Sequence, residues 1–337
     1  MLDLAGFMDA VKAPSVPPEL AWRSTVVRID AAEREPFETF CRTTGIAVTD
    51  TLHRQLNELP TTRNADESYA RWIYLPWRRR VFRLLPPDDY ADVVTDRNRD
   101  KVTREEQRLL RSKSVGVIGL SVGGEAALTI AQEHLCGRLV LADFDEFELS
   151  NLNRLNAGFA DLGLPKTRIV ARRIAELDPY LEVELYEQGV TESNAPAFLT
   201  GLDLLVEECD GLAMKHHIRC LAKERGLDVV YAADERGFLS IEPYSHHDLP
   251  IFHGLATAPS GPYLQGLTAW LGGWDALSDR SRRSVERIGT DLAGYPQLAG
   301  EARYAAAQVA HVARRLLLGE DLPPFHGHLD IGNLIAK

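Results

Sequence analysis

A glycine-rich turn at residues 119–124 has the residue types that bind an anion. The apolar run 115–118 leads into the letters GLSVGG, and an alanine-rich stretch follows. At the start of a helix the backbone N–H groups are unpaired and the helix dipole adds partial positive charge, so a phosphate fits there. The sequence therefore predicts a phosphate site at this turn, formed by Gly119, Ser121, Gly123 and Gly124.

One chemistry that uses such a turn is dinucleotide binding. Enzymes of that kind have a glycine where this chain has Ser121, and an acidic residue about 20 positions after the turn. Asp143 follows Gly119 by 24 residues and is well placed to accept hydrogen bonds from a ribose. Any adenine nucleotide satisfies this arrangement, so Asp143 indicates a nucleotide without choosing between NAD and ATP.

A second chemistry is ester hydrolysis, because residues 119–123 also spell GxSxG, the nucleophile elbow of the α/β-hydrolases. Ser121 would then be the nucleophile, and it would need a later acid and histidine. Asp248 with His326, or Asp210 with His253, are the available pairs. In the alternative interpretation Ser121 is a small residue at a place where the backbone approaches a phosphate closely.

Four charged motifs follow the turn in order: DFD at 143–145, NLNR at 151–154, GLPK at 163–166 and EECD at 207–210. With the turn, this pattern over residues 97–245 resembles the ubiquitin-activating-enzyme-like superfamily, also called ThiF/MoeB/HesA. The resemblance implies an ATP- and Mg²⁺-dependent adenylyltransferase that acts on a carboxylate. Five motifs in order are more specific than one glycine turn, so this interpretation is favoured over the hydrolase.

The chemistry of adenylylation accounts for three of the charged residues. Attack of a carboxylate on the α-phosphate of ATP requires neutralised phosphates and a metal that draws off pyrophosphate. Arg154 and Lys166 supply cations for the phosphates. Asp210 follows a predicted parallel strand, at the edge where such folds bind ligands, and is the expected Mg²⁺ ligand.

The resemblance itself implies further roles. Asp143 is assigned to the ribose, Asn151 to the phosphate network, and Asp145 to the nucleotide-binding group. It also implies a homodimer in which an arginine before the first strand reaches the partner's ATP, and Arg97 or Arg99 is the candidate for that role.

The chain departs from the superfamily in its cysteines and at two positions of the motifs. It has no CxxC pair for zinc and no cysteine after Cys220, so zinc and a catalytic-cysteine relay are not expected. We therefore expect adenylylation alone, of a ubiquitin-like or sulfur-carrier protein, a peptide or a small acid. Gly211 and Ser121 replace an asparagine and a glycine, which leaves a non-catalytic nucleotide-binding scaffold as the alternative function. Lys215 is interpreted as a surface lysine on a helix.

The elements that position these residues follow from alternating apolar runs and helical patterns. Strands are predicted at 115–118, 139–142, 183–186, 204–207 and 229–232, with helices at 103–110, 124–135, 166–177, 215–225 and 301–318. The fold class is α/β, with a Rossmann-like mostly parallel sheet, helices on both faces and an N-terminal α+β extension. The extension is expected at residues 1–95, the nucleotide-binding core at 96–245, and a crossover loop with a substrate and dimer region at 246–337.

The composition of the chain argues against two classes of binding partner, nucleic acids and membranes. The net charge of −11 argues against general nucleic-acid or membrane binding, because those partners select a positive surface. The basic aromatic stretch at residues 71–85 is therefore interpreted as strands with solvent-facing arginines rather than a nucleic-acid site. The chain has no apolar run of membrane-spanning length and no signal peptide at its start, so a cytoplasmic location is expected.

Overall fold

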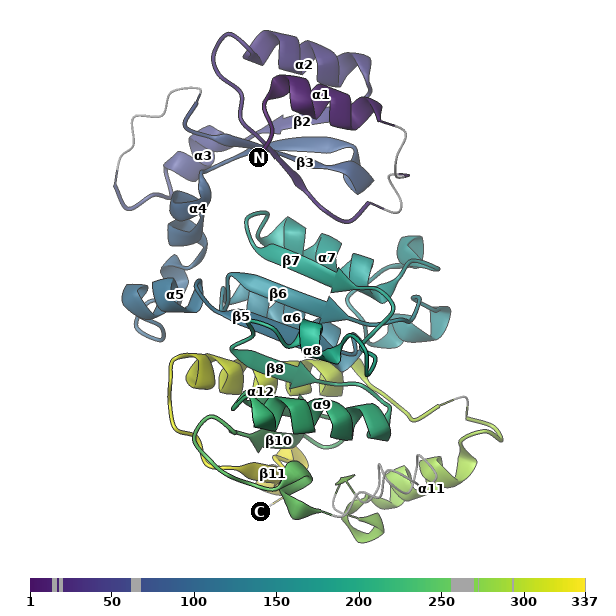
Figure 1. Cartoon of the computed structure of the whole chain (residues 1–337). Coiled ribbons are helices and arrows are strands. Elements are labelled where there is room, and N and C mark those ends of the chain that lie inside the picture. The colour runs from purple at the N-terminus through teal and green to yellow at the C-terminus, as the bar shows by residue number, and fades with distance from the viewer. Residues whose placement is uncertain are drawn as a thin grey trace. The chain divides into compact units, whose positions relative to one another are not determined.

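The computed structural model describes residues 1–13, 17, 21–61, 68–255, 270–271, 273–292 and 294–336. The chain folds as two compact units (Figure 1). Unit 1 contains residues 1–107 and 171–181, and unit 2 contains residues 108–170 and 182–337. Each unit has its own sheet and its own buried apolar cluster. Among the described helices, none has the length and apolar character needed to cross a membrane.

Unit 1 is an α+β unit around a four-stranded sheet of order β1-β3-β4-β2. Its strands are β1 (Thr25–Val27), β2 (Ala47–Asp50), β3 (Arg71–Leu75) and β4 (Arg80–Leu84), and its helices are α1 (Leu4–Lys12), α2 (Arg34–Thr43), α3 (Leu52–Leu56) and α4 (Pro87–Val94). Aromatic rings of α1 and α2 pack on one face of this sheet, with Phe37 5.0 Å from Trp72 between ring centroids. The basic aromatic stretch therefore forms two strands, as predicted, but its arginines do not all face solvent, because Arg83 is buried and paired with Asp50.

Unit 2 contains a seven-stranded sheet of order β11-β10-β9-β8-β5-β6-β7. The strands are β5 (Ser114–Ile118), β6 (Arg138–Ala142), β7 (Glu182–Tyr186), β8 (Leu204–Glu207), β9 (Val229–Ala232), β10 (Phe238–Glu242) and β11 (Phe325–His328). Strands β5 to β9 pair in parallel, whereas β10 pairs antiparallel with both β9 and β11. The five parallel strands were predicted from the sequence, and the two antiparallel strands were not.

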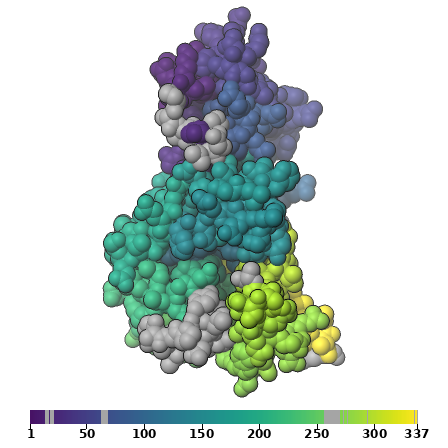
Figure 2. All heavy atoms as spheres, turned by 90° about the vertical axis from the view of Figure 1, so that its right-hand side faces the viewer, coloured from purple at the N-terminus to yellow at the C-terminus, as the bar shows by residue number. Residues whose placement is uncertain are grey.

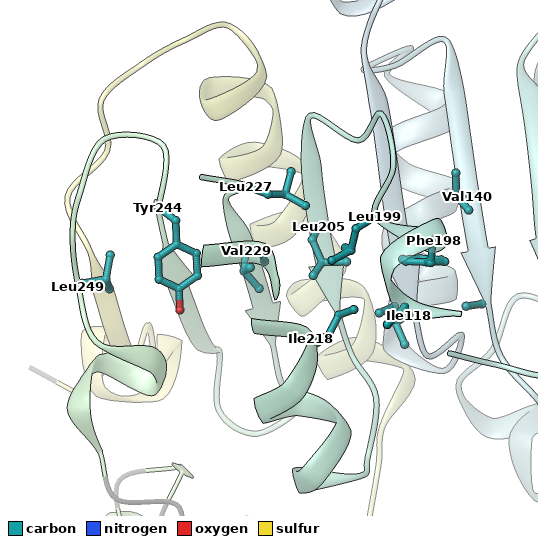
Figure 3. Close-up of a cluster of buried hydrophobic side chains, with 13 residues drawn as sticks. Ile118, Val140, Phe198, Leu199, Leu205, Ile218, Leu227, Val229, Tyr244 and Leu249 are labelled. Atoms are coloured by element: carbon teal, nitrogen blue, oxygen red, sulfur yellow. The ribbon is translucent and has the colours of Figure 1, made fainter. Parts of the chain in front are cut away.

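Helices cover both faces of this sheet because its strands are apolar on both sides. Helices α6 (Val122–Gln132) and α12 (Ala299–Leu317) contact each other and lie behind the sheet in Figure 1. On the other face, α8 (Ala195–Phe198) and α9 (Leu212–Glu224) bury a cluster that includes Phe198, Leu205 and Ile218 (Figure 3). The remaining helices are α5 (Arg104–Leu110), α7 (Lys166–Leu177), α11 (Asp279–Arg287) and α13 (Ile331–Ile335). The predicted α/β fold with a mostly parallel sheet is confirmed.

Candidate active site

The turn between β5 and α6 is shaped by a glycine that no other residue can replace without strain. Gly119 has φ +80°, and a Cβ at this position would collide with the backbone oxygen of Glu208. The turn therefore lies directly against the end of β8. The parallel strands point to the right-hand side of Figure 1, so their carboxyl ends lie on the side of unit 2 that faces the viewer in Figure 2.

Asp143, at the end of β6, holds this turn in place. Its Oδ2 accepts the N–H of Leu120 at 2.6 Å, and its Oδ1 accepts the N–H of Asp145 at 2.7 Å. Burial raises the pKa of Asp143, against the lowering effect of these two donors. A carboxylate has about four lone-pair positions, so Asp143 can accept a ribose hydroxyl in addition to these two bonds.

The segment between β6 and α7 brings two more predicted residues to the same place. The Nζ of Lys166 lies 2.7 Å from the Oδ2 of Asp145, and the Lys166 side chain is 9% exposed. Asn151 is buried, and its Oδ1 accepts the N–H of Glu148 at 2.9 Å, which caps the short helix Leu149–Asn153. Asn151 therefore also has a structural role in ordering the segment.

Arg154 lies beside the turn. Its Nε is 3.4 Å from the Oγ of Ser121, while its Nη1 donates to the backbone oxygen of Ser150 and to Asn153. Burial lowers the pKa of Arg154, and the nearby charges of Asp234 and Asp210 oppose this effect. A guanidinium that is held beside the glycine-rich turn can bind a phosphate with two parallel hydrogen bonds.

These elements enclose a cavity of about 480 Å³, within the size range of small-ligand sites. Its charged lining residues are six acids and two bases: Asp143, Asp145, Glu146, Glu148, Glu208, Asp210, Arg154 and Lys166. Asp210 is exposed, three positions after the end of β8. Among the described residues, no three His, Cys, Asp or Glu side chains form a metal cluster. Asp210 could supply one carboxylate to a Mg²⁺ ion that binds together with the phosphates of a nucleotide.

The structure thus gathers most of the predicted site in one cavity. Gly119, Ser121, Asp143, Asp145, Asn151, Arg154, Lys166 and Asp210 line it. Gly123 and Gly124 are buried in the first turn of α6, where added Cβ atoms would press on Val117 and on Val170. Arg97 and Arg99 belong to unit 1, and Arg99 pairs there with Asp96 at 2.5 Å.

Sequence reasoning missed a buried charge network behind the site. The Lys215 Nζ lies 3.1 Å from both carboxylate oxygens of Glu207, and Arg219 donates to the same carboxylate. Glu207 also accepts the N–H of Cys209 at 2.9 Å, so the network fixes the turn that carries Asp210. Lys215 is 2% exposed. The interpretation of Lys215 as a surface residue was therefore wrong, because its ammonium is neutralised by a carboxylate from the neighbouring strand.

The network extends to β10. The Arg219 Nε donates to Glu242 at 2.6 Å, and the other oxygen of Glu242 accepts the Tyr244 hydroxyl at 2.7 Å and the Phe252 N–H at 2.8 Å. Its two acids and two bases balance in charge, and all four residues are buried. The sequence signal for it is a glutamate at the end of each of two apolar strands, at positions 207 and 242.

Glu208 was also missed, although it lines the cavity. Burial raises the pKa of Glu208 well above its usual value, and Lys215 and the N–H of Ala232 only partly oppose this effect. The raised pKa favours the protonated form of Glu208, in which the carboxyl group donates as well as accepts a hydrogen bond.

The histidines nominated for a hydrolase lie elsewhere. Among the described residues that line the cavity around Ser121, none is a histidine. Within the described part of the chain, His253 contacts the Ser240 hydroxyl at 3.1 Å, and the His326 ring lies 4.5 Å from Trp270. Ser121 instead faces Arg154, which suits an anion site and not a nucleophile that needs a base.

Comparisons with known proteins find one matching family model and several relatives that are similar to part of this chain. Residues 95–261 match the model of the ThiF family. An uncharacterized protein of Mycobacterium tuberculosis is 44% identical over 280 residues, which is 80% of this chain and 39% of that protein. A tRNA threonylcarbamoyladenosine dehydratase of Bacillus subtilis is 32% identical over 133 residues, covering 38% of this chain and 52% of the relative.

Two further relatives extend this similarity. A sulfur carrier protein adenylyltransferase of Thermus thermophilus is 28% identical over 155 residues, covering 46% of this chain and 56% of the relative. The chain thus spans between 39% and 56% of the length of these curated relatives. The solved structure of an E. coli tRNA N6-threonylcarbamoyladenosine dehydratase has the same fold, at a TM-score of 0.50 and 16% identity, over 67% of this chain and 95% of that one.

Proposed function

Because residues 95–261 of this chain belong to the ThiF family, we propose that the protein uses ATP and Mg²⁺ to adenylylate a carboxylate. The observation that carries this proposal is the single cavity that gathers the glycine turn, Asp143, Arg154, Lys166 and Asp210. The turn and the two cations receive the phosphates, and Asp143 accepts the ribose hydroxyls.

The charge balance of the cavity supports a requirement for metal. Six acids and two bases line it, and Lys166 already pairs with Asp145. A triphosphate in such a cavity needs further positive charge. A bound Mg²⁺ would neutralise the phosphates and draw off pyrophosphate, with Asp210 as its protein ligand. An arginine from a second copy, Arg97 or Arg99, would add to this charge in a homodimer.

The reaction breaks the bond between the α-phosphorus and the bridging oxygen of pyrophosphate while the substrate carboxylate forms a new bond to that phosphorus. Arg154 and Lys166 hold the phosphates in place and stabilise the charge that moves onto pyrophosphate. Glu208 lies at the cavity wall, and its raised pKa favours the neutral form, which adds no negative charge beside the nucleotide.

The acid that the protein activates belongs to one of the classes that related names suggest. One relative is named as acting on a sulfur carrier protein, and another as acting on tRNA. The net charge of −11 favours a protein, a peptide or a small acid over tRNA, because nucleic-acid binding depends on positive charge. The C-terminal carboxylate of a small carrier protein is the first substrate to test.

Substrate-dependent ATP–pyrophosphate exchange is the experiment that tests the proposal. Wild-type protein should catalyse exchange only with the correct acid and Mg²⁺. Asp210→Ala should lower exchange by about 100-fold or more. Asp248→Ala is the matched control, because Asp248 is 92% exposed and pairs only with Lys223 among the described residues. Wild-type exchange by Asp210→Ala would remove Asp210 from the mechanism.

Two alternative functions predict other results. A non-catalytic scaffold would bind ATP tightly without exchange for any acid tested. A hydrolase would cleave esters without ATP and lose this activity in Ser121→Ala, whereas the adenylyltransferase should keep most of its exchange in that variant.

The shared-site homodimer has its own test. An inactive Arg97→Ala/Arg99→Ala protein mixed with inactive Asp210→Ala should recover part of the activity, because one site of each mixed dimer has every residue intact. Recovery that stays at zero while the subunits demonstrably exchange would refute the contribution in trans.

A further inference from the structure

The arginines of the basic stretch in unit 1 are committed to local partners, with one exception. Arg71 donates to the backbone oxygens of residues 68–70, Arg78 to Glu176, Arg79 to the backbone oxygen of Thr44, and Arg83 to Asp50. Arg80 is exposed, and its guanidinium has no hydrogen-bond or ion-pair partner among the described residues. The stretch therefore has one arginine without a hydrogen-bond or ion-pair partner among the described residues, and it does not form a basic surface that could bind a polyanion.

Arg80 lies at the rim of an apolar sheet face. The pairing of β3 with β4 sets Ile73 opposite Phe82 and Leu75 opposite Arg80. Because side chains alternate between faces, these residues lie on the face opposite Trp72, Tyr74 and Val81, which pack with α1 and α2. Leu84 lies on the same face as Phe82, and both are half-buried.

A cavity of about 600 Å³ lies over this second face, entirely within unit 1. Ile73, Leu75, Phe82 and Leu84 form its apolar floor, and Tyr90 with Pro179 contribute to its wall. This volume is in the range of sites for small ligands, and a floor of four apolar side chains is the usual lining of such a site.

Hydrogen bonds fix the walls of the cavity. The hydroxyl of Tyr90 donates to the backbone oxygen of Leu177 at 2.7 Å, and the hydroxyl of Tyr180 donates to the backbone oxygen of Leu85 at 2.7 Å. On the other side, Glu176 accepts from Trp77 at 2.7 Å and from Arg78 at 2.8 Å. The space is thus held open by bonded walls and does not depend on a ligand for its shape.

The charges at the rim define the kind of ligand. Arg78, Arg80 and Glu176 all line the cavity, and Arg78 is neutralised by Glu176. One positive charge therefore remains, on Arg80. We propose that this cavity binds an apolar monocarboxylic acid, with the hydrocarbon part over Phe82 and Leu84 and the carboxylate on Arg80. A phosphate ester carries about 1.5 to 2 negative charges at neutral pH and is matched less well by one cation.

This site is separate from the nucleotide cavity, because none of the described residues that line that cavity belongs to unit 1. Its ligand differs from that of the nucleotide site in having an apolar body and a single charge. The proposal can therefore fail while the proposed function stands, and the reverse is also true.

Calorimetric titration of the full chain with decanoate, decanol and butanoate tests the proposal. Decanoate should bind saturably at submillimolar concentration, and at least about tenfold more tightly than butanoate, because burial of only two of its six additional CH₂ groups, at about 0.8 kcal/mol each, already gives that ratio. Decanol, which lacks the charge, should bind about five- to tenfold more weakly than decanoate.

Arg80→Ala should weaken decanoate binding about five- to tenfold and leave decanol binding unchanged. Arg79→Ala is the matched control, since Arg79 is adjacent and exposed but bonds to Thr44 and does not line the cavity. Both side chains are on the surface, so both variants should fold. Absence of saturable decanoate binding, an unchanged affinity in Arg80→Ala, or an equal loss in Arg79→Ala would overturn the proposal.

Discussion

Replacement of Arg219 by methionine is predicted to destabilise unit 2 severely. Arg219 is fully buried and donates to two carboxylates, Glu207 and Glu242. Without Arg219 the network keeps three charged groups, and Lys215 is its one remaining cation beside the two glutamates. Breaking a buried ion pair by deleting one partner costs about 3–5 kcal/mol, because the remaining charge stays buried without compensation.

The expected loss is large enough for simple assays. Unit 2 has about 220 residues, and 1 kcal/mol shifts the melting temperature of such a domain by about 2–4 °C. Arg219→Met should therefore lower the melting temperature of unit 2 by about 6–20 °C, with a matching loss of unfolding free energy in urea. Adding Glu242→Gln should restore part of this loss, because the uncompensated carboxylate is removed while Tyr244 and Phe252 can still donate to the amide oxygen.

Arg225→Met is the control, because Arg225 is exposed just after the same helix and its guanidinium donates only to the backbone oxygen of Leu221 among the described residues. It should change stability by no more than about 0.5 kcal/mol. A loss below about 1 kcal/mol in Arg219→Met, or a double variant less stable than the single one, would refute the idea that buried charge balance maintains this region.

Two other predictions concern the nucleotide turn and the end of β9. Gly119→Ala should abolish pyrophosphate exchange and lower the free energy of unfolding in urea by at least about 1–2 kcal/mol, because alanine is strained at φ +80° and its Cβ meets the Glu208 backbone. Gly158→Ala is the control, because a Cβ at that position meets nothing within 4 Å. Equal losses in both variants would contradict this account. Burial, with a smaller effect from Glu301, raises the pKa of Asp234 from 3.8 to about 6. The folded state therefore holds this proton more tightly than the unfolded chain, so the stability of the wild type relative to Asp234→Asn should fall by about 2–3 kcal/mol as the pH rises from about 4 to 6. Urea denaturation of both proteins across this range measures the difference, and parallel pH profiles would show that Asp234 has no such shift.

The sequence alone was sufficient for the parts of the fold that local patterns encode. Five parallel strands, the basic aromatic strands of unit 1 and the helix at Arg104–Leu110 were all predicted from apolar periodicity and end signals. The capping box of that helix is present, since Glu106 accepts from the Thr103 backbone at 2.8 Å and the Thr103 hydroxyl accepts from the Glu106 backbone at 3.2 Å. These features depend on neighbours within a few residues, so the order of amino acids records them directly.

The predicted site residues were also found together for a local reason. Gly119, Asp143 and Asp210 each follow a parallel strand, and the carboxyl ends of such strands meet at one edge of the sheet. A strand pattern and a position just after it are enough to place a residue at that edge. Arg154 and Lys166 needed the resemblance to a family, because Arg154 lies in a segment without a regular pattern and Lys166 begins a helix and does not follow a strand.

Only the tertiary structure determined which charged side chains are buried and which of them pair with each other. Lys215 and an exposed lysine have the same appearance in a sequence, and Glu207 looks like any acid at the end of a strand. Their pairing depends on α9 packing beside β8, and Glu242 joins them from β10, which pairs antiparallel with β9. Two charged groups interact according to their distance in the folded chain, and the interaction is stronger where both are buried. A sequence pattern therefore predicts where a helix or strand begins and ends, but not which charged side chains pair with each other.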